Sequence, residues 1–143
     1  MVPVAGVSPD QVPDNFRAPR GGARSHGAVD IPAPRGTSVL SADDGRVVRL
    51  QRNRKGGLVI YATDETERFV YYYAHLDAYR RGLAKGARLT RGQVIGFVGT
   101  SGDAGLREPH LHFQVMVRPR GGRGWDGEPL DPRPFFTSTG RAR

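Results

Sequence analysis

The stretch Pro109-His110-Leu111-His112-Phe113-Gln114-Val115-Met116-Val117 alternates between polar and apolar residues. Because successive side chains of a β-strand point to opposite faces, one face carries an apolar row suited to a core, made of Leu111, Phe113, Val115 and Val117. The other face carries His110, His112, Gln114 and Met116. Two residues of a strand span about 6.6 Å, so both imidazoles can reach a ligand between them. The stretch predicts a half-buried strand with a candidate metal site; two unrelated exposed histidines are the alternative.

Glycine and proline interrupt the rest of the chain every eight to twelve residues. The sequence contains 20 glycines and 11 prolines, which argues against long helices. Short β-rich runs lie between these breaks, at Ser38–Ala42, Gly45–Gln51, Leu58–Thr63, Phe69–Leu76, Val94–Val98 and His110–Val117. We expect a helical turn only near Asp77–Leu83. This spacing predicts an all-β fold, either a sandwich or a barrel.

Length and composition restrict the class of protein. A chain of 143 residues, 37% hydrophobic and 25% charged, suits one globular domain rather than a disordered segment. The absence of cysteine excludes zinc fingers and thiol proteases. No apolar run approaches the roughly 20 residues of a transmembrane helix. The residues after Met1 lack the features of a secretory signal, so an exported protein would be represented here by a fragment or a processed form.

The formal net charge of +8 comes almost wholly from arginine. Such a charge favours polyanionic partners, although a solvated basic surface explains it equally well. The arginines form no basic helix and no run interleaved with stacking aromatics, so we do not expect nucleic-acid binding.

Two further histidine-containing patterns, together with the His110/His112 stretch, predict a metal site. The first is His26-Gly27-Ala28-Val29-Asp30, whose even spacing places both polar groups on one side of an extended chain. The second is the strand Val70–Leu76, in which His75 is expected to share a face with Tyr71 and Tyr73. A hydrolytic zinc site needs three protein ligands and an open position. His26, Asp30 and one histidine of the His110/His112 pair supply three ligands, which leaves the other histidine and His75 for proton transfer.

The chain resembles the M23 peptidases, the lysostaphin- and LytM-like zinc metallopeptidases of bacterial cell walls. The likeness is most specific from about Arg24 to Phe113 and extends more loosely from Val2 to about Phe136. The matching stretches are RSHGAVDIPAPRGTSVLSADDGRVV, GGLVIY, YYYAHLDAY, GARLTRGQVIGFVGTSG and PHLHFQV, followed by the closing segment GEPLDPRPFF. Gln114 departs from the Glu of many members and Ala28 from a Gly, and neither is a ligand. The segment Thr100–Glu108 is individual to this chain.

The resemblance implies a fold, an activity and a site. The fold is a small antiparallel β-sandwich with the metal in a groove on one sheet. The activity is zinc-dependent endopeptidase cleavage of peptidoglycan cross-links, with one Zn²⁺ per chain. The resemblance assigns His26, Asp30 and His112 to the metal and makes His75 and His110 catalytic. Which of these two is the base, and which stabilises the oxyanion or protonates the leaving amine, stays open.

The resemblance also sets expectations for organisation and partners. We expect an arm packed on the domain over residues 1–23, the peptidase domain over 24–136 and a flexible tail over 137–143. The expected partners are peptidoglycan stem peptides and cross-bridges, the location is the periplasm or cell exterior, and the state is monomeric. The D-alanine–diaminopimelate cross-link is the first choice of substrate, and glycine bridges stay open.

Two other functions fit parts of the sequence. One is a catalytically silent LytM-like domain that binds the wall and activates other hydrolases, although such domains lose site residues that this chain keeps. The other is a biotinyl- or lipoyl-type carrier, suggested by the segment Gly86–Gly99. Neither Lys55 nor Lys85 lies in the tight turn that a carrier lysine needs.

Overall fold

The computed structural model describes residues 1–16, 27–104, 108–118 and 127–136. These residues form nine β-strands and three short 3-10 turns, and they include no α-helix. No helix of the described residues is long and apolar enough to cross a bilayer. The strands are β1 (Val29–Pro32), β2 (Ser38–Leu40), β3 (Gly45–Asn53), β4 (Gly57–Asp64), β5 (Phe69–Tyr79), β6 (Arg88–Leu89), β7 (Val94–Val98), β8 (His110–Val117) and β9 (Glu128–Leu130); the turns are η1 (Pro9–Gln11), η2 (Gly102–Ala104) and η3 (Arg133–Phe135).

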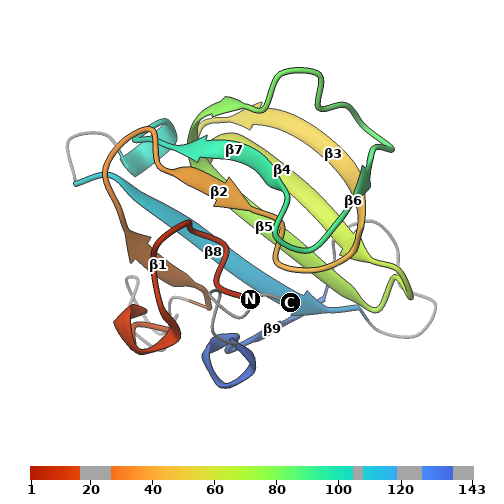
Figure 1. Cartoon of the computed structure of the whole chain (residues 1–143), viewed down its shortest axis with the longest axis horizontal. Coiled ribbons are helices and arrows are strands. Elements are labelled where there is room, and N and C mark those ends of the chain that lie inside the picture. Colours follow the sequence, from red (N-terminus) through yellow and green to blue (C-terminus); the bar gives the residue numbers. More distant parts are fainter. Residues whose placement is uncertain (17–26, 105–107, 119–126, 137–143) are drawn as a thin grey trace.

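All strand pairs of the described residues are antiparallel, as the family resemblance implied. The main path of the sheet runs β1-β8-β5-β4-β3-β6. Strand β7 pairs with both β2 and β5, and β9 pairs with β8. Figure 1 shows β2 and β7 side by side, next to the long strand β5. The nearly all-antiparallel architecture confirms the predicted fold class.

Strand β5 changes its neighbour part-way along its length. Residues Phe69–Ala74 pair with β8, whereas Leu76, Ala78 and Tyr79 pair with β7. His75 lies between these two segments and has a φ of 64°, in the left-handed region. The sheet therefore divides at His75, because the chain must rotate there to leave one partner and meet the other.

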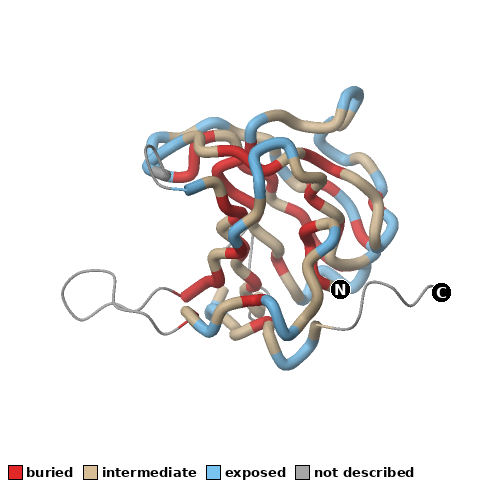
Figure 2. The backbone as a smooth tube through the Cα atoms, turned by 60° about the vertical axis from the view of Figure 1, so that its left-hand side comes forward, coloured by how far each residue is buried: buried red, intermediate tan, exposed pale blue. Residues whose placement is uncertain are grey.

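The core lies on the apolar face of β8 and beneath β2 and β7. Leu111 and Phe113 are buried, as the alternation of β8 predicted, and Val117 at its end is only partly buried. The Phe113 ring packs 5.2 Å from that of Tyr73, whose hydroxyl accepts from the Ala42 amide. Residues near the chain start join this core, with Val2, Val4, Val12 and Phe16 all buried. Figure 2 shows buried positions concentrated inside the molecule and exposed ones on its outer loops.

The prediction of a helical turn near Asp77–Leu83 was wrong. Strand β5 continues to Tyr79, because its last residues pair with β7. A turn closed by the Leu83 amide on the Arg80 carbonyl follows. Pairing with a distant strand outweighed the local sequence, as happens often in β-sheets.

Candidate functional site

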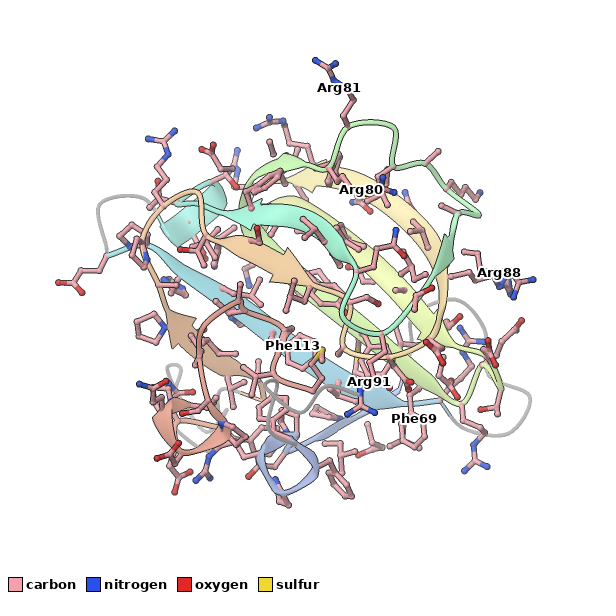
Figure 3. All side chains as sticks on the ribbon, in the orientation of Figure 1. Phe69, Arg80, Arg81, Arg88, Arg91 and Phe113 are labelled. Atoms are coloured by element: carbon pink, nitrogen blue, oxygen red, sulfur yellow. The ribbon has the colours of Figure 1, made fainter. Side chains whose placement is uncertain are left out.

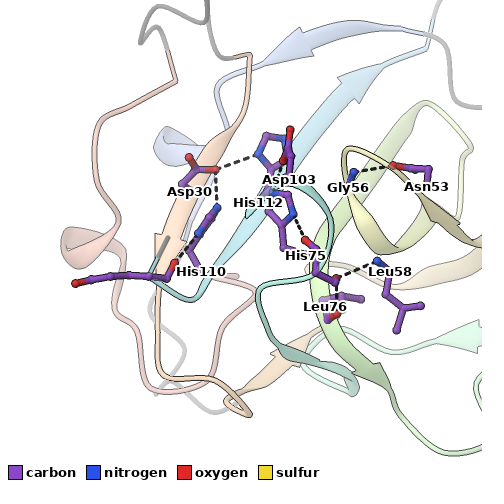
Figure 4. Close-up of polar contacts among 11 residues, drawn as sticks. Asp30, Asn53, Gly56, Leu58, His75, Leu76, Asp103, His110 and His112 are labelled. Atoms are coloured by element: carbon purple, nitrogen blue, oxygen red, sulfur yellow. Dashed lines mark hydrogen bonds and ion pairs between the residues drawn. The ribbon is translucent and has the colours of Figure 1, made fainter. Parts of the chain in front are cut away.

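Asp30 and His112 lie opposite each other on neighbouring strands. The register of β1 and β8 pairs Asp30 with His112 and Pro32 with His110. Directly opposed residues of an antiparallel pair share a face. Asp30 Oδ1 consequently lies 3.0 Å from His112 Nδ1 and 3.8 Å from His110 Nε2. Figure 4 shows Asp30 joined to both imidazoles.

The spacing of these groups fits a metal ion. Zinc ligands at about 2.0–2.1 Å in tetrahedral geometry are roughly 3.3 Å apart, and carboxylate oxygen with imidazole nitrogen is a common donor set. The 3.0 Å separation of Asp30 and His112 is close to that value. Among the described residues, no three His, Cys, Asp or Glu side chains form a metal-holding group on their own. His26, the third predicted ligand, lies outside the described residues.

His75 reaches the same site from β5. Tyr73 pairs with Phe113 on the core face, and Ala74 pairs with His112 on the polar face. Strict alternation would therefore send His75 to the core with Tyr73, and the prediction that His75 shares the face of Tyr71 and Tyr73 was wrong. Its left-handed backbone turns the side chain toward β8 instead. The His75 ring centroid lies 5.1 Å from that of His110 and 5.6 Å from that of His112.

Backbone carbonyls determine which ring nitrogen carries the proton in two of the histidines. His75 Nδ1 lies 2.7 Å from the Ser101 carbonyl, and His110 Nδ1 lies 3.0 Å from the Glu108 carbonyl. Because a carbonyl only accepts, each Nδ1 carries the proton and donates it. Each neutral ring then keeps the lone pair on Nε2. The Nε2 atoms lie 3.8 Å from Asp103 Oδ1 and Asp30 Oδ1, respectively, at the centre of the site.

A close backbone contact holds the Ser101 carbonyl in place. Ser101 Oγ donates to the Leu76 carbonyl at 2.7 Å and accepts from the Leu58 amide at 3.0 Å. Gly57, with a φ of 71°, lies so close to this segment that a Cβ there would be 2.3 Å from Ser101 Oγ. The His75 amide also donates to the Gly56 carbonyl at 2.7 Å. These contacts tie the turn before β4 to His75 and to the segment before η2.

Sequence reasoning missed three residues of this region. The side chain of Asn15 accepts from the Asp30 amide at 3.0 Å and donates to the Asp30 carbonyl, which fixes the start of β1. Ser101 orients His75, and Asp103 faces it. Asn15 and Ser101 had no signal of their own, since each acts through contacts with residues far away in sequence. The only sequence signal for Asp103 was that it lies in the segment Thr100–Glu108, which is individual to this chain.

Burial and charge change the acidity of two groups in the site. Burial lowers the pKa of His75, and the hydrogen bond to Ser101 and the charge of Asp103 partly offset this. Burial raises the pKa of Tyr72 to about 12, and the charges of Tyr61 and Asp103 contribute to the rise. Tyr72 meets His112 edge to face, with ring centroids 6.0 Å apart. Near neutral pH the site therefore presents neutral His75 and a neutral phenol beside two carboxylates.

The antiparallel sheet thus gathers three histidines and an aspartate around one site. The sequence profile of Peptidase family M23 matches residues 24–132, and the chain belongs to that family.

Curated relatives and solved structures agree with this assignment. The chain is 38% identical over 114 residues to the L-Ala–D-Glu endopeptidase of Bacillus subtilis (strain 168), covering 76% of this chain and 34% of that protein. It is 32% identical over 111 residues to the peptidoglycan DD-endopeptidase ShyC of Vibrio cholerae, covering 78% of this chain and 24% of that protein. The chain thus spans about a third or less of the length of either relative.

Two solved structures have the same fold. LytU superposes with a TM-score of 0.74 at 28% identity, covering 87% of this chain and 83% of that chain. A zinc-containing peptidase from Vibrio cholerae gives a TM-score of 0.64 at 26% identity, covering 89% of this chain and 34% of that chain.

Proposed function

We propose that this chain is a zinc-dependent endopeptidase domain that hydrolyses peptide cross-links of bacterial peptidoglycan. His26, Asp30 and His112 are the proposed metal ligands, and His75 and His110 the proposed catalytic residues. The observation that carries the proposal is the 3.0 Å approach of Asp30 Oδ1 to His112 Nδ1, with the rings of His75 and His110 close to it. The zinc-containing relative of known structure supports the choice of metal.

The metal would supply Lewis-acid chemistry: bound zinc acidifies water to a pKa of roughly 7 and polarises a substrate carbonyl. His110 Nε2 lies 3.8 Å from Asp30 Oδ1, and its ring is oriented by the Nδ1 contact with the Glu108 carbonyl, so this atom is placed to accept a proton. His75 Nε2 is the second group that can hold or deliver a proton, because its Nδ1 is fixed by Ser101. Neutral imidazoles suit both roles near pH 7.

The substrate is peptidoglycan, and the cell envelope is the proposed site of action. The names of the curated relatives specify different bonds, L-Ala–D-Glu in one and a DD bond in the other. The D-alanine–diaminopimelate cross-link therefore stays the first choice without excluding others, and the monomeric state stays a prediction. The alternative, a silent domain that activates other hydrolases, is not favoured by relatives that are themselves endopeptidases.

The test combines metal analysis with digestion of purified cell walls. We expect the purified protein to retain about one equivalent of zinc and to release new amino termini from peptidoglycan. His112→Ala should lose both the metal and the activity. Met116→Ala is the matched control, since Met116 lies on the same face of β8, outside the histidine cluster.

Three results would contradict parts of this proposal. Folded protein that binds no divalent ion would exclude the metal site. Activity that survives in His112→Ala would exclude the ligand assignment. Protein that retains zinc and binds peptidoglycan without cleaving it would favour the silent domain.

A further inference from the structure

The charge beside the histidine cluster contrasts with the charge of the chain as a whole. The formal net charge is +8. Arginines such as Arg81 and Arg88 project from the β6 side of the molecule (Figure 3). Carboxylates flank the histidines: Asp30 lies between His110 and His112, and Asp103 lies beside His75. Asp30 is a proposed ligand of the metal, so Asp103 is the carboxylate of this cluster that remains to attract a positive group of a substrate.

Asp103 combines contact with the site and access to solvent. Its Oδ1 lies 3.8 Å from His75 Nε2, and its side chain is 62% exposed whereas that of His75 is 7% exposed. No arginine or lysine among the described residues forms an ion pair with Asp103, and the neighbouring His75 is neutral near pH 7. Most of the carboxylate surface is thus open to a ligand that approaches His75.

The backbone that carries Asp103 is held at several points. The Asp103 amide donates to the Lys55 carbonyl at 2.9 Å. A Cβ on Gly102 would lie 2.3 Å from the Gly57 amide nitrogen, so these two segments pack without space between them. Ser101 is anchored through Leu58 and Leu76. A carboxylate on a fixed backbone is pre-organised, which favours its use in recognition.

Tyr72 lies near the same position. Its ring meets His112 at a centroid distance of 6.0 Å, and the charge of Asp103 acts on its hydroxyl. An ammonium group is attracted both by a carboxylate and by the face of an aromatic ring. Asp103 provides the carboxylate beside His75, and Tyr72 provides an aromatic ring beside His112.

We propose that Asp103 is a specificity-determining residue that binds a primary ammonium group of the substrate beside His75. This inference rests on the proposed peptidase function and specifies the substrate class further. Two sources in a cross-linked peptide have this chemistry, the free side-chain amine of a diamino acid and the terminal amine of a glycine chain. A carboxylate at the same position would be repelled, so substrates with an amine are preferred over acidic ones.

The experiment compares soluble cross-linked wall fragments before and after acetylation of their free amines. One fragment carries only the diamino-acid side-chain amine and another only the terminal amine of a glycine chain, which separates the two sources. We expect acetylation of the recognised amine to raise the wild-type KM about 5-fold with little change in kcat, the scale of one partly exposed ion pair. Asp103→Asn should show the higher KM on both forms, and Asp103→Glu should recover the preference.

Glu65→Gln is the matched control, because it removes one exposed negative charge just after β4 and outside the site. The preference for the amine should persist in this control and diminish at 0.5 M salt, where the screening length is only about 4 Å.

An acetylation effect of equal size in wild type and Asp103→Asn would overturn the proposal. So would an equal loss of kcat on both forms, since Asp103 would then act through His75. If the wild type cleaves no fragment, the peptidase proposal fails and this inference fails with it; cleavage without any preference for the amine overturns the inference alone.

Discussion

His75 Nδ1 donates a 2.7 Å hydrogen bond to the Ser101 carbonyl, 26 residues further along the chain. Ser101 in turn joins β4 to β5 through its hydroxyl, which contacts Leu58 and Leu76. The orientation of a proposed catalytic histidine therefore depends on a serine that has no catalytic chemistry of its own here.

Removing the hydroxyl of Ser101 should affect stability and catalysis together. Ser101→Ala loses two hydrogen bonds and leaves the Leu58 amide and the Leu76 carbonyl without them, which costs about 1–3 kcal/mol of unfolding free energy. We expect a lower kcat with a nearly unchanged KM, because the His75 ring is held less firmly. Urea unfolding and steady-state kinetics measure both effects. Ser8→Ala is the control, because the Ser8 hydroxyl bonds only to the nearby residues Asp10 and Gln11, and equal behaviour of the two variants would contradict the role of Ser101.

The contact between Gly57 and Ser101 should tolerate no side chain. Gly57→Ala places a Cβ 2.3 Å from Ser101 Oγ and 2.4 Å from the Gly102 amide nitrogen, in addition to the strain of a positive φ. Gly82 also has a positive φ, of 85°, and has open space around it. Gly82→Ala should cost roughly 1–2 kcal/mol from backbone strain alone, and Gly57→Ala should cost clearly more. Thermal unfolding of both variants tests this, and equal losses would show that the collision is relieved by movement.

Asp64 should make the turn between β4 and β5 sensitive to acid. Burial alone would raise the pKa of this carboxyl, but hydrogen bonds from Thr66, Phe69 and Arg68 outweigh it and lower the pKa below its ordinary value of 3.8. The folded state therefore favours the ionised form. Its contribution to stability is complete above about pH 4 and is lost as the pH falls through the lowered pKa.

Asp64→Asn measures this contribution directly. The variant should be less stable than the wild type at pH 7, and the difference should narrow at pH values below 4. Unfolding midpoints in urea from pH 7 to pH 2.5 provide the measurement. A difference that does not change with pH would mean that packing, rather than charge, explains the effect.

Metal binding should be visible in stability as well as in activity. A ligand that binds only the folded state stabilises it by about 2.7 kcal/mol at 100 times its Kd. Chelation should therefore lower the melting temperature of the wild type, and zinc should restore it. His112→Ala should melt at one temperature under both conditions. A chelator effect of equal size in this variant would show that the ion binds elsewhere.

The local pattern of β8 was sufficient to predict its faces. Leu111 and Phe113 are buried and His112 lies on the opposite face, because alternation is a property of any extended chain. The density of glycine and proline likewise predicted strands rather than long helices, although β5 is longer than expected, at 11 residues. The pairing of β5 with β7, which replaced the expected helical turn, could not be predicted in this way, since it depends on a partner strand fifteen or more residues away.

The sequence by itself determined which residue types were available for the site: four histidines, no cysteine and an aspartate at Asp30. The sequence patterns and the family resemblance assigned His75 to the site, but only the tertiary structure shows how its side chain reaches His110 and His112. Alternation places it on the core face, and a left-handed backbone at a φ of 64° turns it to the other. The same holds for Asp103, which becomes part of the site because the glycine backbones of Gly57 and Gly102 pack directly against each other. Such contacts arise when distant segments meet, and no periodicity along the chain records them.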